Sequence, residues 1–266
     1  GIYSAKAALA LAEKYDVMVH GHLAESKSEY DFTMEQFGCS PVEWFWRNNL
    51  LGDRFYYAHC IHLDEQDIKV LAETGTGVVS CPISNMYLSS GSCQVRTMMD
   101  AGVERIGLGV DGAASSNSSN MMEEMRVAYL LNRLTHEENA CTSENILYMA
   151  TAGGAKTLGR NDIGTLVPGK AADLTLLDWS SLSYAGGRND PADCIVRSGD
   201  ARMVDTVIVN GEIVVKKGRL LRIDEWQKSA YADEMSHELL QRASKHFLAL
   251  QEEIISSVQE STGGAL

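Results

Sequence analysis

The residues best suited to chemistry in this chain are histidines and carboxylates that follow short apolar segments. His20, His22 and Glu25 stand in the stretch His-Gly-His-Leu-Ala-Glu-Ser, His59 ends a second apolar segment, and Asp111 ends a later one. Imidazole nitrogens and carboxylate oxygens are zinc ligands, and they are also common proton-transfer groups in enzymes. These residue types predict a metal site that also moves protons.

Each of these residues also has an ordinary structural explanation. A single histidine is more often a satisfied structural residue than a ligand, and His136, His237 and His246 lie in polar helical surroundings where we interpret them in that way. Asp111 could form a turn or cap a helix, and Glu25 could be a solvated carboxylate at a helix start. The recurrence of such groups at successive strand ends favours the chemical interpretation.

Four predicted strands position these groups. Short apolar segments rich in β-branched or aromatic residues are found at 16–19, 54–59, 77–82 and 104–111. Helical patterns separate them, among them residues 4–15, the region around Tyr30 to Phe37, the segment that Pro41 opens, the segment after Asp64 to Asp67, and residues 95–101. This alternation predicts a parallel α/β sheet of four βα units, about half of a (β/α)8 barrel.

In a barrel all strands end at the same mouth, so polar groups at the strand ends converge although they are distant in the sequence. His20 or His22 follows the first strand, His59 the second, Asn85 the third and Asp111 the fourth. We therefore expect one site at this mouth. Alternation along an extended chain places His20 and His22 on the same face, and periodicity alone does not choose between them.

The later half of the chain changes in composition. Helices are predicted at about 120–134 and 143–158, the second with Thr142 or Ser143 as its N-cap. A turn-rich segment at 162–173 introduces a strand at 174–177, and Asn210-Gly211 predicts a hairpin between 204–209 and 212–215. One or two amphipathic helices with a frayed tail are expected from 224 to about 259. The predicted domains are 1–160 (barrel units), 161–222 (small β-sandwich element) and 223–266 (C-terminal helices).

Composition excludes some classes of function. The formal net charge is −13 over 266 residues and no basic stripe is visible, which argues against a nucleic-acid binder. The six cysteines form no C-x-x-C pair, which predicts buried free thiols in a reducing cytoplasm. No apolar run approaches the roughly 20 residues of a membrane span. The chain begins with Gly rather than Met, and we expect it to be the later part of a longer protein.

Four ordered motifs and one later segment carry a resemblance to a known family. The segments His22-Leu23-Ala24-Glu25, Ala58 to Leu63, Cys81 to Met86 and Gly109 to Ser115 resemble consecutive strand-end motifs of the amidohydrolase superfamily. Residues 163–174 are similar to the entry into that family's small β-sandwich. The branch is the one that hydrolyses purines, pterins and triazines, and residues 182–191 and 86–90 are most similar to its members that act on 8-oxoguanine.

The resemblance implies a role for each matched residue. His22 and Asp111 would bind one divalent metal, zinc as first candidate and iron as second. Glu25 would protonate a substrate ring nitrogen, His59 would hydrogen-bond the oxyanion, and Asp111 would also act as base. His62 and Asn85 are expected to contact substrate. The family's other two ligands form a His-x-His pair after the first barrel strand, and we expect that pair before residue 1.

The resemblance also implies a reaction. Metal-bound hydroxide would attack the amine-bearing carbon of an oxidised purine or related heterocycle, with 8-oxoguanine to urate and ammonia as first candidate. Alternatives are a triazine or pterin amino- or chlorohydrolase, a guanine or adenosyl deaminase, and a non-catalytic binding protein of the same fold. The expected partner is a small heterocyclic substrate. A homo-oligomer is also possible, with Trp44 to Trp46 and the C-terminal helices as contact surfaces.

Overall fold

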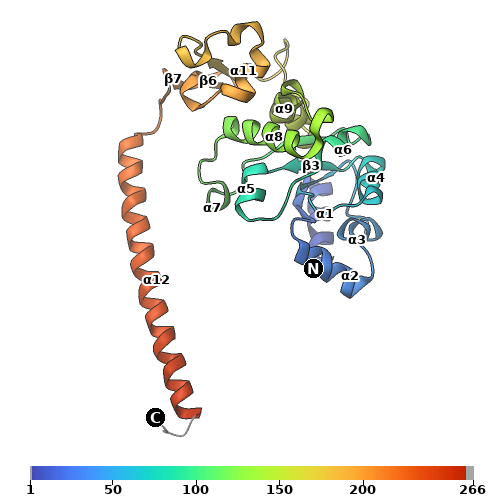
Figure 1. Ribbon diagram of the computed structural model, residues 1–266, viewed down its shortest axis with the longest axis vertical. Coiled ribbons are helices and arrows are strands. Elements are labelled where there is room, and N and C mark those ends of the chain that lie inside the picture. The colour runs from blue at the N-terminus through green and yellow to red at the C-terminus, as the bar shows by residue number, and fades with distance from the viewer. Residues whose placement is uncertain (1, 262–266) are drawn as a thin grey trace.

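Two sheets organise the computed structural model, which describes residues 2–261 (Figure 1). The first contains β1 (Val19–Leu23), β2 (Phe55–His59), β3 (Gly77–Ser80) and β4 (Ile106–Leu108). Its neighbouring strands are parallel and follow the order of the sequence. A doubly wound sheet reverses its strand order, whereas a barrel advances strand by strand. This sheet therefore has the order of consecutive barrel units, as predicted.

Helices join these strands. They are α1 (Ile2–Tyr15), α2 (Lys27–Phe37), α3 (Pro41–Arg47), α4 (Glu65–Thr74), α5 (Pro82–Tyr87), α6 (Val95–Asp100), α7 (Ala113–Ser116) and α8 (Met121–His136), followed by a 3₁₀ turn (Glu137–Asn139). Side-chain caps start several of them. Ser26 and Ser40 accept hydrogen bonds from backbone N–H groups of α2 and α3, and Asp64 and Asp67 form a reciprocal capping box at α4.

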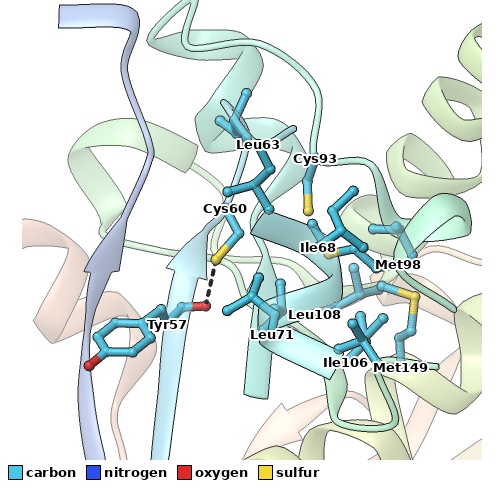
Figure 2. Packing of buried hydrophobic residues seen from close by; sticks show 14 of the residues in the cluster. Tyr57, Cys60, Leu63, Ile68, Leu71, Cys93, Met98, Ile106, Leu108 and Met149 are labelled. Atoms are coloured by element: carbon cyan, nitrogen blue, oxygen red, sulfur yellow. Dashed lines mark hydrogen bonds between the residues drawn. The ribbon is translucent and has the colours of Figure 1, made fainter. Parts of the chain in front are cut away.

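The main hydrophobic core lies between the parallel sheet and helices α3, α4, α6 and α8. It includes Tyr57 and Ile106 from the strands and Leu71, Met98 and Met125 from the helices, and Figure 2 shows part of this packing. All six cysteines are free and buried, which confirms the prediction of free thiols. Close packing in one core fixes the strands relative to one another, and so it fixes the residues that leave their ends.

The first predicted strand is displaced by three residues. Residues 16–19 were expected to form it, but Asp16 has a left-handed backbone (φ 51°), and pairing with β2 begins only where Val19 meets Phe55. Val17 is correspondingly 52% exposed. His20 and His22 therefore lie within β1 rather than after it.

The third predicted strand is shorter than expected and the helix after it was missed. Residues 77–82 were expected to be extended, but β3 ends at Ser80 and Pro82 opens α5. Proline suits the first turn of a helix because its missing N–H has no helical partner there. The fourth predicted strand, residues 104–111, is likewise extended in a regular ladder only over β4.

The helix predicted over 143–158 is interrupted. It consists of α9 (Ser143–Tyr148), a π-helical turn (Met149–Gly153) and α10 (Gly154–Thr157), and Thr142 is its N-cap. A Cβ atom on Gly153 would collide with the carbonyl oxygen of Ile106. The helix therefore packs against the backbone of β4 more closely than any side chain would permit, at the point where its regular winding is broken.

The second sheet is antiparallel and contains β5 (Leu174–Leu177), β6 (Val204–Val209), β7 (Glu212–Lys216) and β8 (Arg219–Leu220). Asn210 and Gly211 both have positive φ and form the predicted hairpin turn. Between β5 and β6 the chain forms 3₁₀ turns at Leu182–Tyr184, Gly187–Asn189 and Ala201–Met203 and the helix α11 (Pro191–Ser198). Because α11 packs against α8 and α9, it connects this region to the parallel sheet.

A single long helix, α12 (Glu225–Ser261), follows the second sheet (Figure 1). Its described side chains, through Phe247, are exposed, while the predicted frayed tail lies outside the described residues. No helix within residues 2–261 combines the length and the apolar character needed to cross a membrane. Of the proposed aromatic contact surface, Trp44 and Phe45 pack against the core and only Trp46, 55% exposed, faces solvent.

Candidate active site

Of the two histidines on β1, His22 faces the site. The His20 ring stacks on Tyr56 with centroids 4.5 Å apart, and its Nδ1 lies 3.3 Å from the Tyr56 carbonyl oxygen. Burial, together with the neighbouring His22 and His59, lowers the pKa of His20 and favours its neutral form. The His22 ring lies edge-on to that of His59, with centroids 4.9 Å apart. The family resemblance implied His22 as the metal ligand, and that role stays a prediction.

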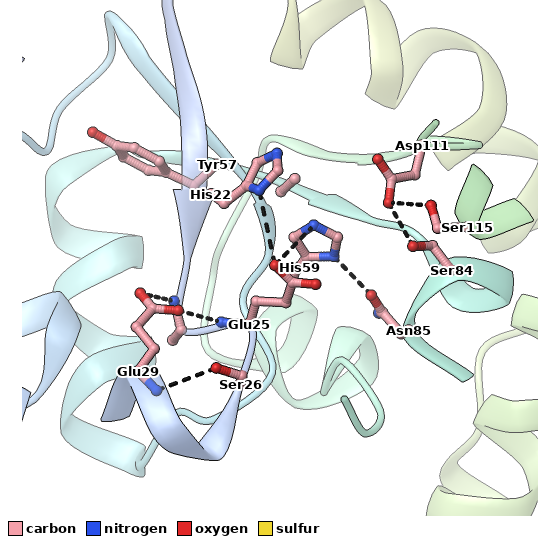
Figure 3. A network of polar contacts seen from close by, with 12 residues as sticks. His22, Glu25, Ser26, Glu29, Tyr57, His59, Ser84, Asn85, Asp111 and Ser115 are labelled. Carbon is pink, nitrogen blue, oxygen red and sulfur yellow. Dashed lines mark hydrogen bonds and ion pairs between the residues drawn. The ribbon is translucent and has the colours of Figure 1, made fainter. Parts of the chain in front are cut away.

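A tight turn after β1 directs Glu25 back toward the histidines. Ala24 has a left-handed backbone (φ 51°), and the backbone N–H groups of Ala24 and Glu25 donate to the two oxygens of Glu29 at 3.0 and 2.9 Å. Glu25 Oε2 then lies 3.8 Å from His22 Nδ1 and 3.7 Å from His59 Nε2 (Figure 3). Sequence reasoning missed Glu29, which the spacing Ser-x-x-Glu from Ser26 could have revealed.

His59 is the most deeply buried of these groups, with 1% of its surface exposed. Its Nδ1 lies 2.8 Å from Asn85 Oδ1 on α5. Because an amide oxygen only accepts, Nδ1 carries the proton in this bond, and in the neutral ring Nε2 keeps its lone pair. Asn85 thus sets both the orientation and the tautomer of His59.

Asp111 approaches the same region from the end of β4. The hydroxyl groups of Ser84 and Ser115 donate to its Oδ2, the second at 2.9 Å (Figure 3). Burial raises the pKa of Asp111, but hydrogen bonds from Ser84, Gly112 and Ser115, together with the nearby His59, outweigh burial and bring the pKa below its usual value. Asp111 is therefore a carboxylate at neutral pH, able to hold a cation or accept a proton.

Left-handed backbone marks the ends of three of the four strands. Ala24 follows β1 (φ 51°), His59 and Cys60 stand at the end of β2 (φ 75° and 48°), and Asp111 follows β4 (φ 59°). For residues with a Cβ atom this conformation costs about 1–2 kcal/mol each. Such residues persist where the surrounding structure imposes them, and they cluster at functional sites.

The two predicted substrate contacts lie at this edge of the sheet. His62 Nε2 lies 3.0 Å from the carbonyl oxygen of Ser90, so His62 holds the loop that follows α5. Asn85 is 1% exposed, and its Nδ2 has no hydrogen-bond partner among the described residues. The predicted substrate contact of each residue stays a prediction.

The donor set at this site fits zinc. One ligand atom each from His22, Glu25 and His59 lie within 4.8 Å of one another. Two imidazoles and a carboxylate are common zinc donors, and the hydrogen bond from His59 to Asn85 is of the kind that orients metal-binding imidazoles. This group contains Glu25, which was predicted to transfer a proton, and His59, which was predicted to hydrogen-bond the oxyanion. It does not contain Asp111, which was predicted as a ligand.

Comparisons with known proteins identify the family of this chain. The sequence profile of the amidohydrolase family matches residues 4–214. The chain is 41% identical over 238 residues to a 5-methylthioadenosine/S-adenosylhomocysteine deaminase from Desulforudis audaxviator, covering 89% of this chain and 55% of that protein. It is also 41% identical over 219 residues to an 8-oxoguanine deaminase from Pseudomonas aeruginosa, covering 82% of this chain and 48% of that protein.

Solved structures of two zinc-bound hydrolases share this fold. An adenosine deaminase from Xanthomonas campestris with bound zinc matches with a TM-score of 0.86 at 30% identity, over 91% of this chain and 55% of that one. An atrazine chlorohydrolase from Arthrobacter aurescens complexed with zinc matches with a TM-score of 0.82 at 26% identity, over 88% and 52%. This chain spans about half the length of the curated relatives it matches. From its barrel-type sheet and the family match over residues 4–214, the chain belongs to the amidohydrolase family.

Proposed function

We propose that the protein is a metal-dependent aminohydrolase that removes an amino group from a nitrogen heterocycle. The observation that carries this proposal is the arrangement of His22, Glu25 and His59 at the ends of β1 and β2. Asp111, three residues after β4, is near enough to His59 for that ring to help lower the pKa of its carboxyl. This set combines cation ligands with groups that move protons, and hydrolytic deamination needs both.

His22 and Asp111 are the proposed metal ligands in this chain. The two remaining imidazole ligands that the family resemblance implies are proposed to precede Gly1. A zinc ion, when bound, lowers the pKa of its water from about 16 toward 7 and so supplies a nucleophile at neutral pH.

The other side chains handle protons during the reaction. Asp111 accepts a proton from the attacking water. Glu25 donates a proton through Oε2 to a ring nitrogen of the substrate. It then relays to the departing amine the proton that Asp111 took from the water, and it is reprotonated by the new hydroxyl group as the carbonyl forms. The products are ammonia and the substrate with a carbonyl in place of its amine. Protonated at both ring nitrogens, His59 keeps its Nδ1–H bond to Asn85 and donates a second hydrogen bond from Nε2–H to the oxygen that develops negative charge. One such contact contributes about 3–4 kcal/mol.

8-Oxoguanine is the first candidate substrate. The Pseudomonas aeruginosa 8-oxoguanine deaminase supports it, but a 5-methylthioadenosine/S-adenosylhomocysteine deaminase is equally similar at 41% identity. In the test, the complete, zinc-loaded protein is incubated separately with 8-oxoguanine, guanine, 5-methylthioadenosine, a pterin and a chlorotriazine. We expect ammonia and urate from 8-oxoguanine. If the protein releases only chloride, and only from the triazine, it is a triazine chlorohydrolase. If it acts on none of these compounds, the alternative of a non-catalytic binding protein is favoured.

A second assignment of the ligands follows from the close grouping of His22, Glu25 and His59. Zinc titration of the variants Glu25→Gln, Asp111→Asn and His20→Asn separates the two. The proposed assignment predicts weaker zinc binding only for Asp111→Asn. Weaker binding for Glu25→Gln would favour Glu25 as a ligand. His20→Asn is the control, since His20 stacks on Tyr56 and is not one of the three grouped ligand residues.

A further inference from the structure

One short helix orients both Asp111 and His59. Ser84 and Asn85 are consecutive residues of α5, and both are buried, at 0% and 1% exposure. The Ser84 hydroxyl donates to Asp111 Oδ2, and Asn85 Oδ1 accepts from His59 Nδ1 at 2.8 Å. A shift of α5 would therefore disturb an acidic and a basic group of the site together.

The six-residue helix α5 depends on its surroundings for its position. Isolated helices of this length are not stable in water. Its N-cap residue, Cys81, makes no side-chain cap hydrogen bond, and Pro82 has no N–H. The first backbone donor of α5 is therefore Ile83 N–H.

A buried carboxyl group from another helix accepts a hydrogen bond from this N–H group. Ile83 N–H donates to Glu124 Oε2 of α8 at 3.1 Å, across 41 residues of sequence. Glu124 is 0% exposed, and its Oε1 has no hydrogen-bond partner among the described residues. Burial of a carboxyl with one backbone partner opposes folding, and burial is the main cause that raises the pKa of Glu124 to about 7. A group that is costly to bury fits a role in the site better than a role in stability.

We propose that Glu124 is a positioning residue that holds α5 so that Ser84 and Asn85 orient Asp111 and His59. The consequence for turnover rests on the proposed function. The hydrogen bond that Glu124 accepts from Ile83 carries the effect, because it is the polar link between α8 and the start of α5.

Three substitutions test whether the acceptor itself matters. Glu124→Gln keeps an oxygen at the same reach, Glu124→Asp withdraws it by one methylene, and Glu124→Met removes it at similar volume. In the complete zinc-loaded protein we expect the kcat of Glu124→Gln to stay within about threefold of wild type. Glu124→Met and Glu124→Asp should lower kcat by about 10- to 100-fold, the range seen when the groups that orient metal ligands are removed, with little change in KM. The neighbouring exposed Glu123→Met is the matched control.

A second readout needs no substrate. In protein with ¹⁵N-labelled histidine, the Nδ1–H signal of His59, which reports its bond to Asn85, should persist in Glu124→Gln and shift or broaden in Glu124→Met and Glu124→Asp. The proposal is overturned if that signal and kcat stay at wild-type values in folded Glu124→Met or Glu124→Asp. It is also overturned if Glu124→Gln lowers kcat as much as Glu124→Met does. If wild-type protein turns over no substrate but the His59 signal follows this series, the proposed function fails and the positioning role stands.

Discussion

Replacing Glu124 with Gln should change how the stability of the protein depends on pH. The carboxyl of Glu124 is fully buried, and burial, opposed by the Ile83 N–H bond and reinforced by the charge of Asp111, raises its pKa from 4.5 to about 7. A raised carboxyl pKa means that the folded protein holds this proton more tightly than the unfolded chain. The stabilisation that this proton gives to the folded state is therefore fully present below pH 4.5, and it is lost as the pH rises to about 7.

The size of the effect follows from the shift. A change from 4.5 to about 7, at 1.36 kcal/mol per pKa unit, corresponds to about 3 kcal/mol of unfolding free energy. Glutamine has nearly the same shape and does not titrate. The unfolding free energy of Glu124→Gln minus that of the wild type should therefore rise by about 3 kcal/mol from about pH 4.5 to about pH 8, and then stay level.

Urea unfolding at a series of pH values measures this difference. Other titrating groups contribute nearly equally to both proteins and cancel in the subtraction. Glu123→Gln, which removes an exposed carboxyl beside Glu124 on the same helix, is the control. It should show only the small part of the rise that comes from the charge of Glu123 acting on Glu124. A difference that is the same at pH 5 and pH 8, or one that falls with pH, would refute the argument that Glu124 is buried at a cost.

Three further outcomes test other parts of the account. Asn85→Ala removes the acceptor of the His59 Nδ1–H, and steady-state assays should find kcat lowered about 10- to 100-fold; an unchanged kcat would show that Asn85 does not orient His59. Glu25→Gln should lower kcat by about 10²- to 10⁴-fold while zinc content, measured by metal analysis, stays at the wild-type value. Thr142→Ala removes the N-cap of α9 and should cost about 1 kcal/mol in urea unfolding; no loss would mean that the cap does not support the helix.

Sequence patterns predicted the sheet because each strand and helix carries its own local signal. The apolar segments, the proline at α3, the cap at Thr142 and the Asn210-Gly211 turn act over a few residues, and the structure has these elements near the expected positions. Strand ends were less well predicted. The hydrogen-bonded pairing of β1 starts at Val19 because its partner strand β2 begins at Phe55. The sequence around residue 19 does not indicate where that partner strand begins.

Around the site, residues within local motifs could be predicted from the sequence, whereas residues placed by long-range packing could not. His22, Glu25, His59 and Asp111 were recognised because they lie beside strand ends within motifs. Glu124 was not predicted, because a glutamate in a helix is usually solvent-exposed and its burial depends on packing against α5. The interruption of the helix at Gly153 likewise depends on how closely that helix approaches β4.

The most direct test of the central claim measures ammonia released from 8-oxoguanine by the complete protein before chelation, after chelation, and after zinc is restored. The account predicts ammonia and urate in equal amounts, loss of both on chelation, and recovery with zinc. Ammonia release that survives complete removal of metal would contradict it, as would a zinc-replete protein that releases none from any aminoheterocycle.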